Sequence, residues 1–204
     1  GDSMTDGNLI VKDFRTYLQE KFGGQGVGLV NITSESASSR SSITHELKID
    51  QSLSHNGVCL TVVKINGNLY TVTAIEETLK RTSLAELTLG SLVNLERCML
   101  ANGRFDGHMV QGHVDTIGIC SEIKNLNGSW EFLFDYEQSK NRFTVEKGSI
   151  TVNGVSLTVV RSGDSQFSVC IIPYTFENSN FKNLTVGSKV NLERSLLLTE
   201  RLDG

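Results

Sequence analysis

The stretch HNGVCLTVV at residues 55–63 is repeated as VNGVSLTVV at residues 152–160. The offset of 97 that superimposes the two stretches gives 24 identities over the 56 positions of 52–107 and 149–204. Unrelated segments of ordinary composition would match at about one position in fifteen. The chain therefore contains a duplicated unit, and this duplication sets both its domain count and its architecture.

Each copy reads as short strands joined by tight turns. An Asn-Gly pair between two apolar runs is the strongest short-range signal for a two-residue hairpin, and it occurs at Asn56-Gly57 and again at Asn153-Gly154. Two further strands are predicted at Gly112–Ile123 and Trp130–Tyr136, across the turn at Asn127-Gly128. Short strands at this close, regular spacing predict an all-β protein whose repeated unit is a closed antiparallel barrel rather than a parallel sheet.

The predicted domains are an atypical segment over residues 1–47, a first barrel over 48–107 and a second barrel over 108–204. The second unit holds a full set of about six strands. The first unit lacks counterparts for two of them, which should lie within 11–48, where no resemblance is found. We expect either a strand at Val27–Ile32 to stand in or a neighbouring chain to supply the missing strands.

The first 47 residues follow an α/β-like pattern of their own. An apolar stripe predicts a helix over Asp13–Phe22, followed by the strand at Val27–Ile32 and a Ser-rich loop over Thr33–Ser42. The opening Gly-Asp-Ser resembles the start of the GDSL (SGNH) esterase family, in which Ser3 would be the nucleophile. A nucleophile needs a base, and the later His-containing block of that family is absent, so an esterase fragment is the least favoured reading.

Composition excludes several classes of function. The 204 residues suffice for two domains of roughly 100 each, and a net charge of −4 gives no basic field for nucleic acid. There is no apolar run of about 18 residues to span a membrane, and no signal peptide opens the sequence. The four cysteines form no C-x-x-C pair, which favours a reducing, cytoplasmic setting over a zinc site.

Polar residues near the junction of the two units are candidates for a site. His108 and His113 lie five apart without a third ligand, so no metal is expected. On its own, His113 reads as a partly buried residue satisfied by a backbone group, and Cys59 as a small core residue. Thr61 and Thr158 read as strand formers. The residues alone predict a small-molecule site at the mouth of a barrel, with backbone and hydroxyl donors.

Six motifs carry a resemblance to a known family: NGVCLTV (56–62), ETLKRTSL (77–84), VNLER (93–97), DGHMVQGHVD (106–115), NGVSLTV (153–159) and IPYT (172–175). In this order, and over about 47–193, they resemble the riboflavin synthase family of the α-chain type. The resemblance implies an all-β fold of two tandem six-stranded antiparallel Greek-key barrels and a trimer built by a C-terminal helix. It also implies conversion of two molecules of 6,7-dimethyl-8-ribityllumazine into riboflavin and 5-amino-6-(ribitylamino)uracil, with no metal and no redox cofactor.

The resemblance also implies the site residues. Catalytic roles in proton transfer or nucleophile activation fall on Ser52, Cys59 and His113, with the base unassigned among them. The substrate-binding positions implied for the first pocket are Cys59, Leu60, Thr61, Thr73, Ala74, Ile75, Glu76, Glu77, Thr78, Gly112, His113 and Val114. Those implied for the second pocket are Lys147, Ser156, Leu157, Thr158, Cys170, Ile171, Ile172, Pro173, Tyr174 and Thr175.

The sequence departs from the family pattern in three places. No Met-Phe-Thr/Ser-Gly-Ile-Val segment opens it, Ser195 stands where the family usually has an acidic residue, and the tail copies the end of the first half. These departures predict a weaker or different assembly than the family's trimer. They also keep open a second function, that of a lumazine- or flavin-binding protein without turnover.

Overall fold

The computed structural model describes residues 9–11, 27–33, 43–67, 69–88, 90–137 and 144–195. The predicted helix at 13–22, Ser3 and the loop at 34–42 lie outside the described residues. Among the described residues strands predominate and helices are short, which confirms the predicted all-β fold. No helix in this part of the chain is both long and apolar enough to cross a membrane.

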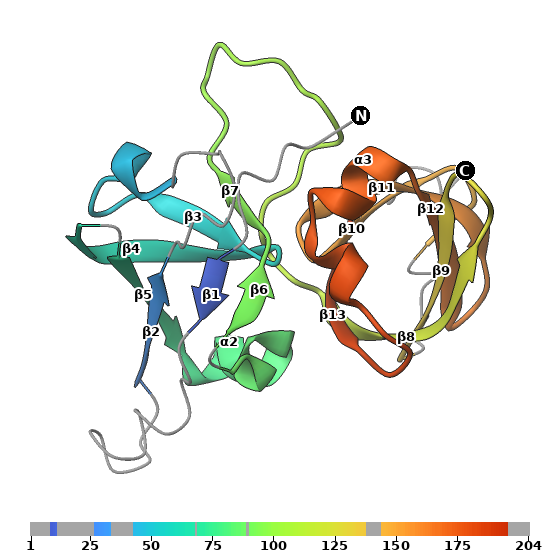
Figure 1. Cartoon of the computed structure of the whole chain (residues 1–204), viewed down its shortest axis with the longest axis horizontal. Coiled ribbons are helices and arrows are strands. Elements are labelled where there is room, and N and C mark those ends of the chain that lie inside the picture. Colours follow the sequence, from blue (N-terminus) through green and yellow to red (C-terminus); the bar gives the residue numbers. More distant parts are fainter. Residues whose placement is uncertain are drawn as a thin grey trace.

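The second repeat forms a closed antiparallel barrel, seen end on in Figure 1. The strand order is β10-β11-β12-β9-β8-β13. The strands are β8 (Thr116–Asn125), β9 (Trp130–Tyr136), β10 (Ser149–Val152), β11 (Val155–Ser162), β12 (Gln166–Ile171) and β13 (Lys189–Arg194). Alternate residues along each strand point inward, so Phe132, Phe134 and Phe167 fill the core together with Phe181.

The first repeat forms a seven-stranded sheet in the order β6-β1-β2-β5-β4-β3-β7. Its strands are β1 (Leu9–Val11), β2 (Val27–Thr33), β3 (Ser52–His55), β4 (Val58–Asn66), β5 (Leu69–Ile75), β6 (Ser91–Val93) and β7 (Leu95–Arg97). The two edge strands, β6 and β7, are separated only by Asn94. The sheet therefore curls until its ends meet within one residue, which gives the first repeat a barrel like that of the second.

The two strands that the first repeat lacked in sequence are supplied by the chain itself. Strand β2 pairs with β5 from Val27↔Ile75 to Thr33↔Leu69, as β9 pairs with β12 in the second barrel. Strand β1 bridges β2 and β6, as β8 bridges β9 and β13. The strand predicted at 27–32 thus stands in, and the strands of the first sheet begin before residue 48.

Each barrel carries a short helix at the same point of its repeat. Helix α2 (Glu76–Arg81) follows β5, and α3 (Pro173–Glu177) follows β12. A 3-10 turn follows each helix, η2 (Ser83–Glu86) and η3 (Asn180–Asn183), and a third, η1 (Ile43–Glu46), precedes β3. The helices cap the barrels: the ring of Phe176 stacks on that of Trp130 at a centroid distance of 3.9 Å.

The two hairpin turns of the repeated stretch meet back to back where the barrels join. Gly57 and Gly154 both have φ near +80°, and a Cβ on either would lie 2.8 Å from the backbone nitrogen of the other. Only glycine permits both the left-handed backbone and this close approach. The Asn-Gly pairs therefore form the seam between the barrels as well as the turns predicted for them.

Four asparagines related by the repeat tie this seam together. Within each barrel, the N–H of Asn94 donates to Asn56 Oδ1, and that of Asn191 to Asn153 Oδ1, both at 2.8 Å. Across the seam, Asn94 Nδ2 donates to the carbonyl of Asn153, and Asn191 Nδ2 to that of Asn56, both at 2.9 Å. All four side chains are buried. The network has the two-fold symmetry of the repeat, so the barrels face each other through equivalent surfaces.

Candidate active site at the seam between the barrels

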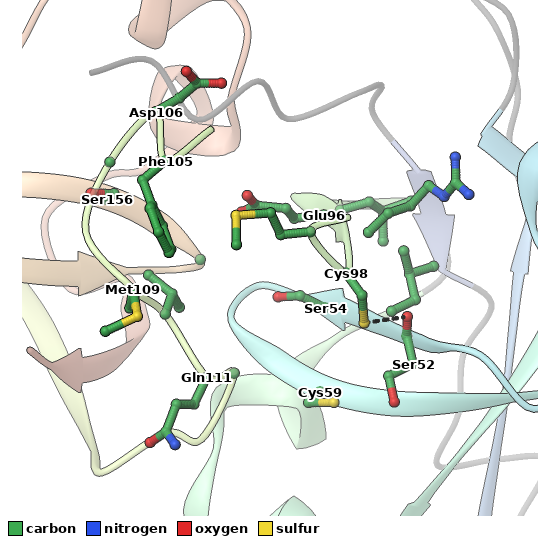
Figure 2. A pocket seen from close by; sticks show the side chains of 18 of the residues that line it. Ser52, Ser54, Cys59, Glu96, Cys98, Phe105, Asp106, Met109, Gln111 and Ser156 are labelled. Carbon is green, nitrogen blue, oxygen red and sulfur yellow. Dashed lines mark hydrogen bonds between the residues drawn. The ribbon is translucent and has the colours of Figure 1, made fainter. Parts of the chain in front are cut away.

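A cavity of about 650 Å³ opens beside this seam. One wall is the outward face of the first barrel, where register places Ser54 opposite Cys59 on β4 and opposite Glu96 on β7. Leu53 and His55 point into the barrel and are buried, so alternation along β3 turns Ser52 and Ser54 outward. Ser52, Ser54, Cys59 and Glu96 thus form one polar row on the cavity wall (Figure 2).

The facing wall is the linker between β7 and β8, whose loop rises beside the seam in Figure 1. Its apolar side chains Met99, Phe105 and Met109 are 52%, 60% and 52% exposed and line the cavity. Figure 2 shows Phe105 and Met109 on the side of Ser156, across the cavity from the polar row. Exposed aromatic and thioether side chains offer a flat heterocycle surfaces for stacking.

The linker is anchored to both barrels at Gly112. The N–H of Cys59 donates to the Gly112 carbonyl at 2.9 Å. Gly112 has a φ of +76°, and a Cβ added to it would lie 2.9 Å from the Cβ of Cys59, so only glycine fits at this position. On the other side, the Glu193 carboxylate accepts the N–H groups of Gln111 at 2.7 Å and His113 at 2.9 Å. Burial nevertheless raises the pKa of Glu193, with the backbone donors acting in the opposite direction.

Glu96 is the counterpart of Glu193 in the repeat, and its surroundings differ. Among the described residues no hydrogen-bond donor contacts the Glu96 carboxylate. Burial raises its pKa from the ordinary value of 4.5 to about 7. A carboxyl group in a cavity whose pKa lies near neutrality can both accept and return a proton.

The second barrel contributes Ser156, the counterpart of Cys59. The imidazole Nδ1 of His108 lies 2.7 Å from Ser156 Oγ, and its Nε2 lies 3.0 Å from Thr151 Oγ1. The main-chain N–H of His108 also donates to Ser156 Oγ, at 3.2 Å. Burial lowers the pKa of His108, which favours the neutral form of its imidazole.

Of the residues predicted from the sequence, the structure places four on the cavity wall: Ser52, Cys59, Gly112 and Ser156. His113 is adjacent to them through Gly112. It is exposed rather than partly buried as predicted, because Glu193 holds its main chain while its side chain projects outward. Val114 packs against the first core.

The remaining predicted residues lie at matching places on the two barrels, outside the cavity wall. The side chains of Leu60, Ala74 and Ile171 are in the hydrophobic cores, so any ligand contact they make is through their backbone. The others lie on β4, at the β5–α2 corner and at the counterparts of these places in the second barrel: Thr61, Thr73, Ile75, Glu76, Glu77, Thr78, Leu157, Thr158, Cys170, Ile172, Pro173, Tyr174 and Thr175. Lys147 lies in the turn that precedes β10. Burial raises the pKa of the Cys170 thiol.

Sequence reasoning missed several residues of the cavity. Two of them had a sequence signal: strand alternation places Ser54 on the outward face, and the repeat pairs Glu96 with Glu193. Phe105 and Met109 had no such signal, because the linker has no periodicity. Within the described residues, no group of three or more His, Cys, Asp or Glu side chains is placed to hold a metal ion.

Comparison with known proteins agrees with this architecture. The lumazine binding domain family matches residues 24–98 and 111–195, one match for each barrel. Riboflavin synthase from Actinobacillus pleuropneumoniae is 44% identical over 155 residues, which cover 76% of this chain and 72% of that protein. Riboflavin synthase from Bacillus subtilis is 41% identical over 157 residues, covering 77% and 73%.

A solved structure shares the fold at low sequence identity. LumP complexed with riboflavin superimposes with a TM-score of 0.79 at 20% identity, over 94% of this chain and 97% of that one. LumP complexed with 6,7-dimethyl-8-(1'-D-ribityl) lumazine gives a TM-score of 0.76. The two barrels, their matching seam and the sequence identity lead to one conclusion: this chain belongs to the riboflavin synthase family and carries its lumazine binding domain twice.

Proposed function

We propose that this chain is a riboflavin synthase. It would convert two molecules of 6,7-dimethyl-8-ribityllumazine into riboflavin and 5-amino-6-(ribitylamino)uracil. The observation that carries the proposal is the cavity at the seam, which has Cys59 of the first barrel and Ser156 of the second on its wall. A reaction between two identical molecules suits a protein that carries two related sites.

The cavity suits a ligand of this size and shape. Its volume of about 650 Å³ lies within the range of roughly 300–1,000 Å³ typical of small-molecule sites. The apolar linker side chains supply stacking surfaces for the ring system, and the polar row supplies partners for the ribityl hydroxyls. Transfer of a four-carbon unit between two heterocycles depends on holding them in one orientation, and such positioning can supply about 7–11 kcal/mol of the barrier.

The reaction also requires removal of a proton from a ring methyl group. The family resemblance assigns proton transfer or nucleophile activation to Ser52, Cys59 and His113. To these we add Glu96, because its pKa of about 7 lets it accept a proton and return it near neutral pH. Its place in the same row as Ser54 and Cys59 supports this role.

The resemblance also bears on partners and location. In the family the first barrel of one subunit faces the second barrel of another, so we propose that this chain works as a homo-oligomer. The sequence departures lead us to expect an assembly other than the family's trimer, which the mass in solution would test. The four free cysteines support a reducing location, and we propose the cytoplasm.

A second function, lumazine or flavin binding without turnover, is favoured by one observation. Ser195, at the position where the family usually has an acidic residue, is buried and only 7% exposed. Incubation of the purified protein with 6,7-dimethyl-8-ribityllumazine, followed by riboflavin fluorescence, separates the two functions. Turnover that His113→Ala abolishes supports the synthase, whereas tight binding with no product supports the binding protein.

A further inference from the structure

The duplicated stretch differs chemically at one functional position, where the first barrel has Cys59 and the second has Ser156. Both side chains line the cavity. A thiol is intrinsically nucleophilic, and part of it is ionised near neutral pH. A serine hydroxyl is a weak nucleophile unless an adjacent base accepts its proton. If the two residues have equivalent tasks, the second barrel needs a base that the first does not.

His108 is placed as that base. Its Nδ1 lies 2.7 Å from Ser156 Oγ, within hydrogen-bond reach. Its Nε2 lies 3.0 Å from the hydroxyl of Thr151, which is buried. With the imidazole proton on Nε2 and donated to Thr151, Nδ1 is left to accept the hydroxyl proton of Ser156. The arrangement has the order of groups that activates nucleophilic serines: nucleophile, base and a third group that orients the base.

The backbone is shaped to bring His108 to this position. A Cβ on Gly107 would lie 2.6 Å from Ser156 Oγ, so only glycine lets the linker pass this close. In the first barrel the equivalent approach to Cys59 is made by Gly112, whose main-chain carbonyl accepts the N–H of Cys59. The next residue, His113, is exposed, and among the described residues no imidazole is hydrogen-bonded to Cys59. Of the two equivalent positions, Cys59 and Ser156, the serine is the one that is hydrogen-bonded to an imidazole, that of His108.

We propose that His108 activates Ser156 and so makes this serine the second-barrel equivalent of Cys59. This inference rests on the proposed synthase function. His108 acts through Ser156 and is therefore a positioning residue, whereas Ser156 contacts the substrate.

The chemical step is a reversible addition. Ser156 Oγ forms a bond to an electrophilic C=N carbon of the bound lumazine ring while its hydroxyl proton moves to His108 Nδ1. The π electron pair of the C=N bond moves onto the ring nitrogen, and the charge is delocalised into the pyrimidinedione. In the reverse step the C–O bond breaks, the electron pair restores the C=N bond and the proton returns to Oγ. No oxidant, reductant or further reactant is needed.

The kinetic test compares His108→Gln with the matched control His45→Gln, an exposed histidine outside the cavity. Loss of a base typically lowers the rate by 10²–10⁴-fold, so we expect His108→Gln to lower kcat about 100-fold with KM nearly unchanged. The control should keep wild-type kcat. Because a thiol needs no base, adding Ser156→Cys to His108→Gln should restore at least tenfold of the loss. Wild-type kcat in His108→Gln, or no recovery in the double variant, would overturn the proposal.

A second readout does not depend on turnover. Nitrogen-15 NMR of histidine-labelled protein should show neutral His108 protonated on Nε2, and Ser156→Ala should shift the Nδ1 signal. A proton on Nδ1, or no response to Ser156→Ala, would overturn the pairing. An inactive wild-type protein that still shows the predicted tautomer and response would refute the synthase function and leave the pairing standing.

Discussion

Replacing Asn94 by alanine tests whether the seam between the barrels is a major source of stability. Asn94 is 4% exposed. Its Nδ2 donates to the carbonyl of Asn153 and to Asn180 Oδ1, both at 2.9 Å, and its Oδ1 accepts the N–H of Asn180 at 2.7 Å. All these groups are buried, so bulk solvent does not reach the partners that the substitution leaves behind.

The expected cost follows from the groups that lose their partner. Asn94→Ala removes the hydrogen bonds to two buried backbone groups, the Asn153 carbonyl and the Asn180 N–H. Each such loss typically costs about 1–3 kcal/mol, so we expect a loss of about 2–6 kcal/mol in the free energy of unfolding. Asn191→Ala likewise leaves two backbone groups without a side-chain partner, the carbonyl of Asn56 and the N–H of Ser83. It breaks one hydrogen bond fewer and should cost about 1 kcal/mol less.

Urea denaturation gives the measurement. The single tryptophan, Trp130, lies in the second barrel and reports its unfolding, while far-UV circular dichroism reports both barrels. Asn183→Ala, an exposed control on η3, should change stability by less than about 0.5 kcal/mol. We expect the fluorescence and dichroism transitions to separate in Asn94→Ala, because the barrels lose their connection. A cost below 1 kcal/mol with coincident transitions would refute the role assigned to the seam.

Three further predictions concern the seam and the cavity. Gly57→Ala should destabilise the protein by at least about 2 kcal/mol in thermal unfolding, because residue 57 has a left-handed φ and its Cβ would lie 2.8 Å from Gly154. Gly67→Ala is the control, since Gly67 also has a positive φ but its Cβ would meet nothing within 4 Å, and it should cost less. Equal costs for the two substitutions would contradict the seam geometry. Burial raises the pKa of Glu96 in the folded state to about 7, so the stability that this group contributes is present below pH 4.5 and is lost as pH rises through 7. Over this window the wild type should lose up to about 3 kcal/mol in the free energy of unfolding relative to Glu96→Gln. Stability profiles of the two proteins that stay parallel with pH would contradict the burial of this group. Glu193→Ala should release the linker from the second barrel, which would raise KM for the lumazine about tenfold with a smaller change in kcat, whereas an unchanged KM would show that the linker is held by other contacts.

The sequence predicted the barrels because the repeat and strand periodicity are local signals. The Asn-Gly pairs at 56–57 and 153–154 predicted hairpins, and the structure has them. Strands β1 and β2 had no sequence counterpart, since strand pairing uses backbone groups that any suitable extended segment can supply. The strand at Val27–Ile32 was nevertheless predicted as a possible replacement, and β2 confirms it. Strand β1 had no sequence signal and was found only in the structure.

The candidate site was only partly predictable for a different reason. Cys59 and Ser156 are placed by the repeat, and both line the cavity. The contact of His108 with Ser156 joins residues 48 apart in the chain, and it depends on the path of an aperiodic linker. The seam was not predicted because the hairpin turns already explained Asn56 and Asn153, and nothing else in the sequence indicated that these residues also form contacts between the barrels.

The most direct test of the central claim is the stoichiometry of turnover. The purified chain is incubated with 6,7-dimethyl-8-ribityllumazine as the sole substrate in EDTA, and lumazine, riboflavin and 5-amino-6-(ribitylamino)uracil are quantified together by chromatography. A riboflavin synthase consumes two lumazines for each riboflavin and each uracil product, and we predict this ratio throughout the reaction. Lumazine that binds to the protein and remains unconverted after long incubation would contradict the account.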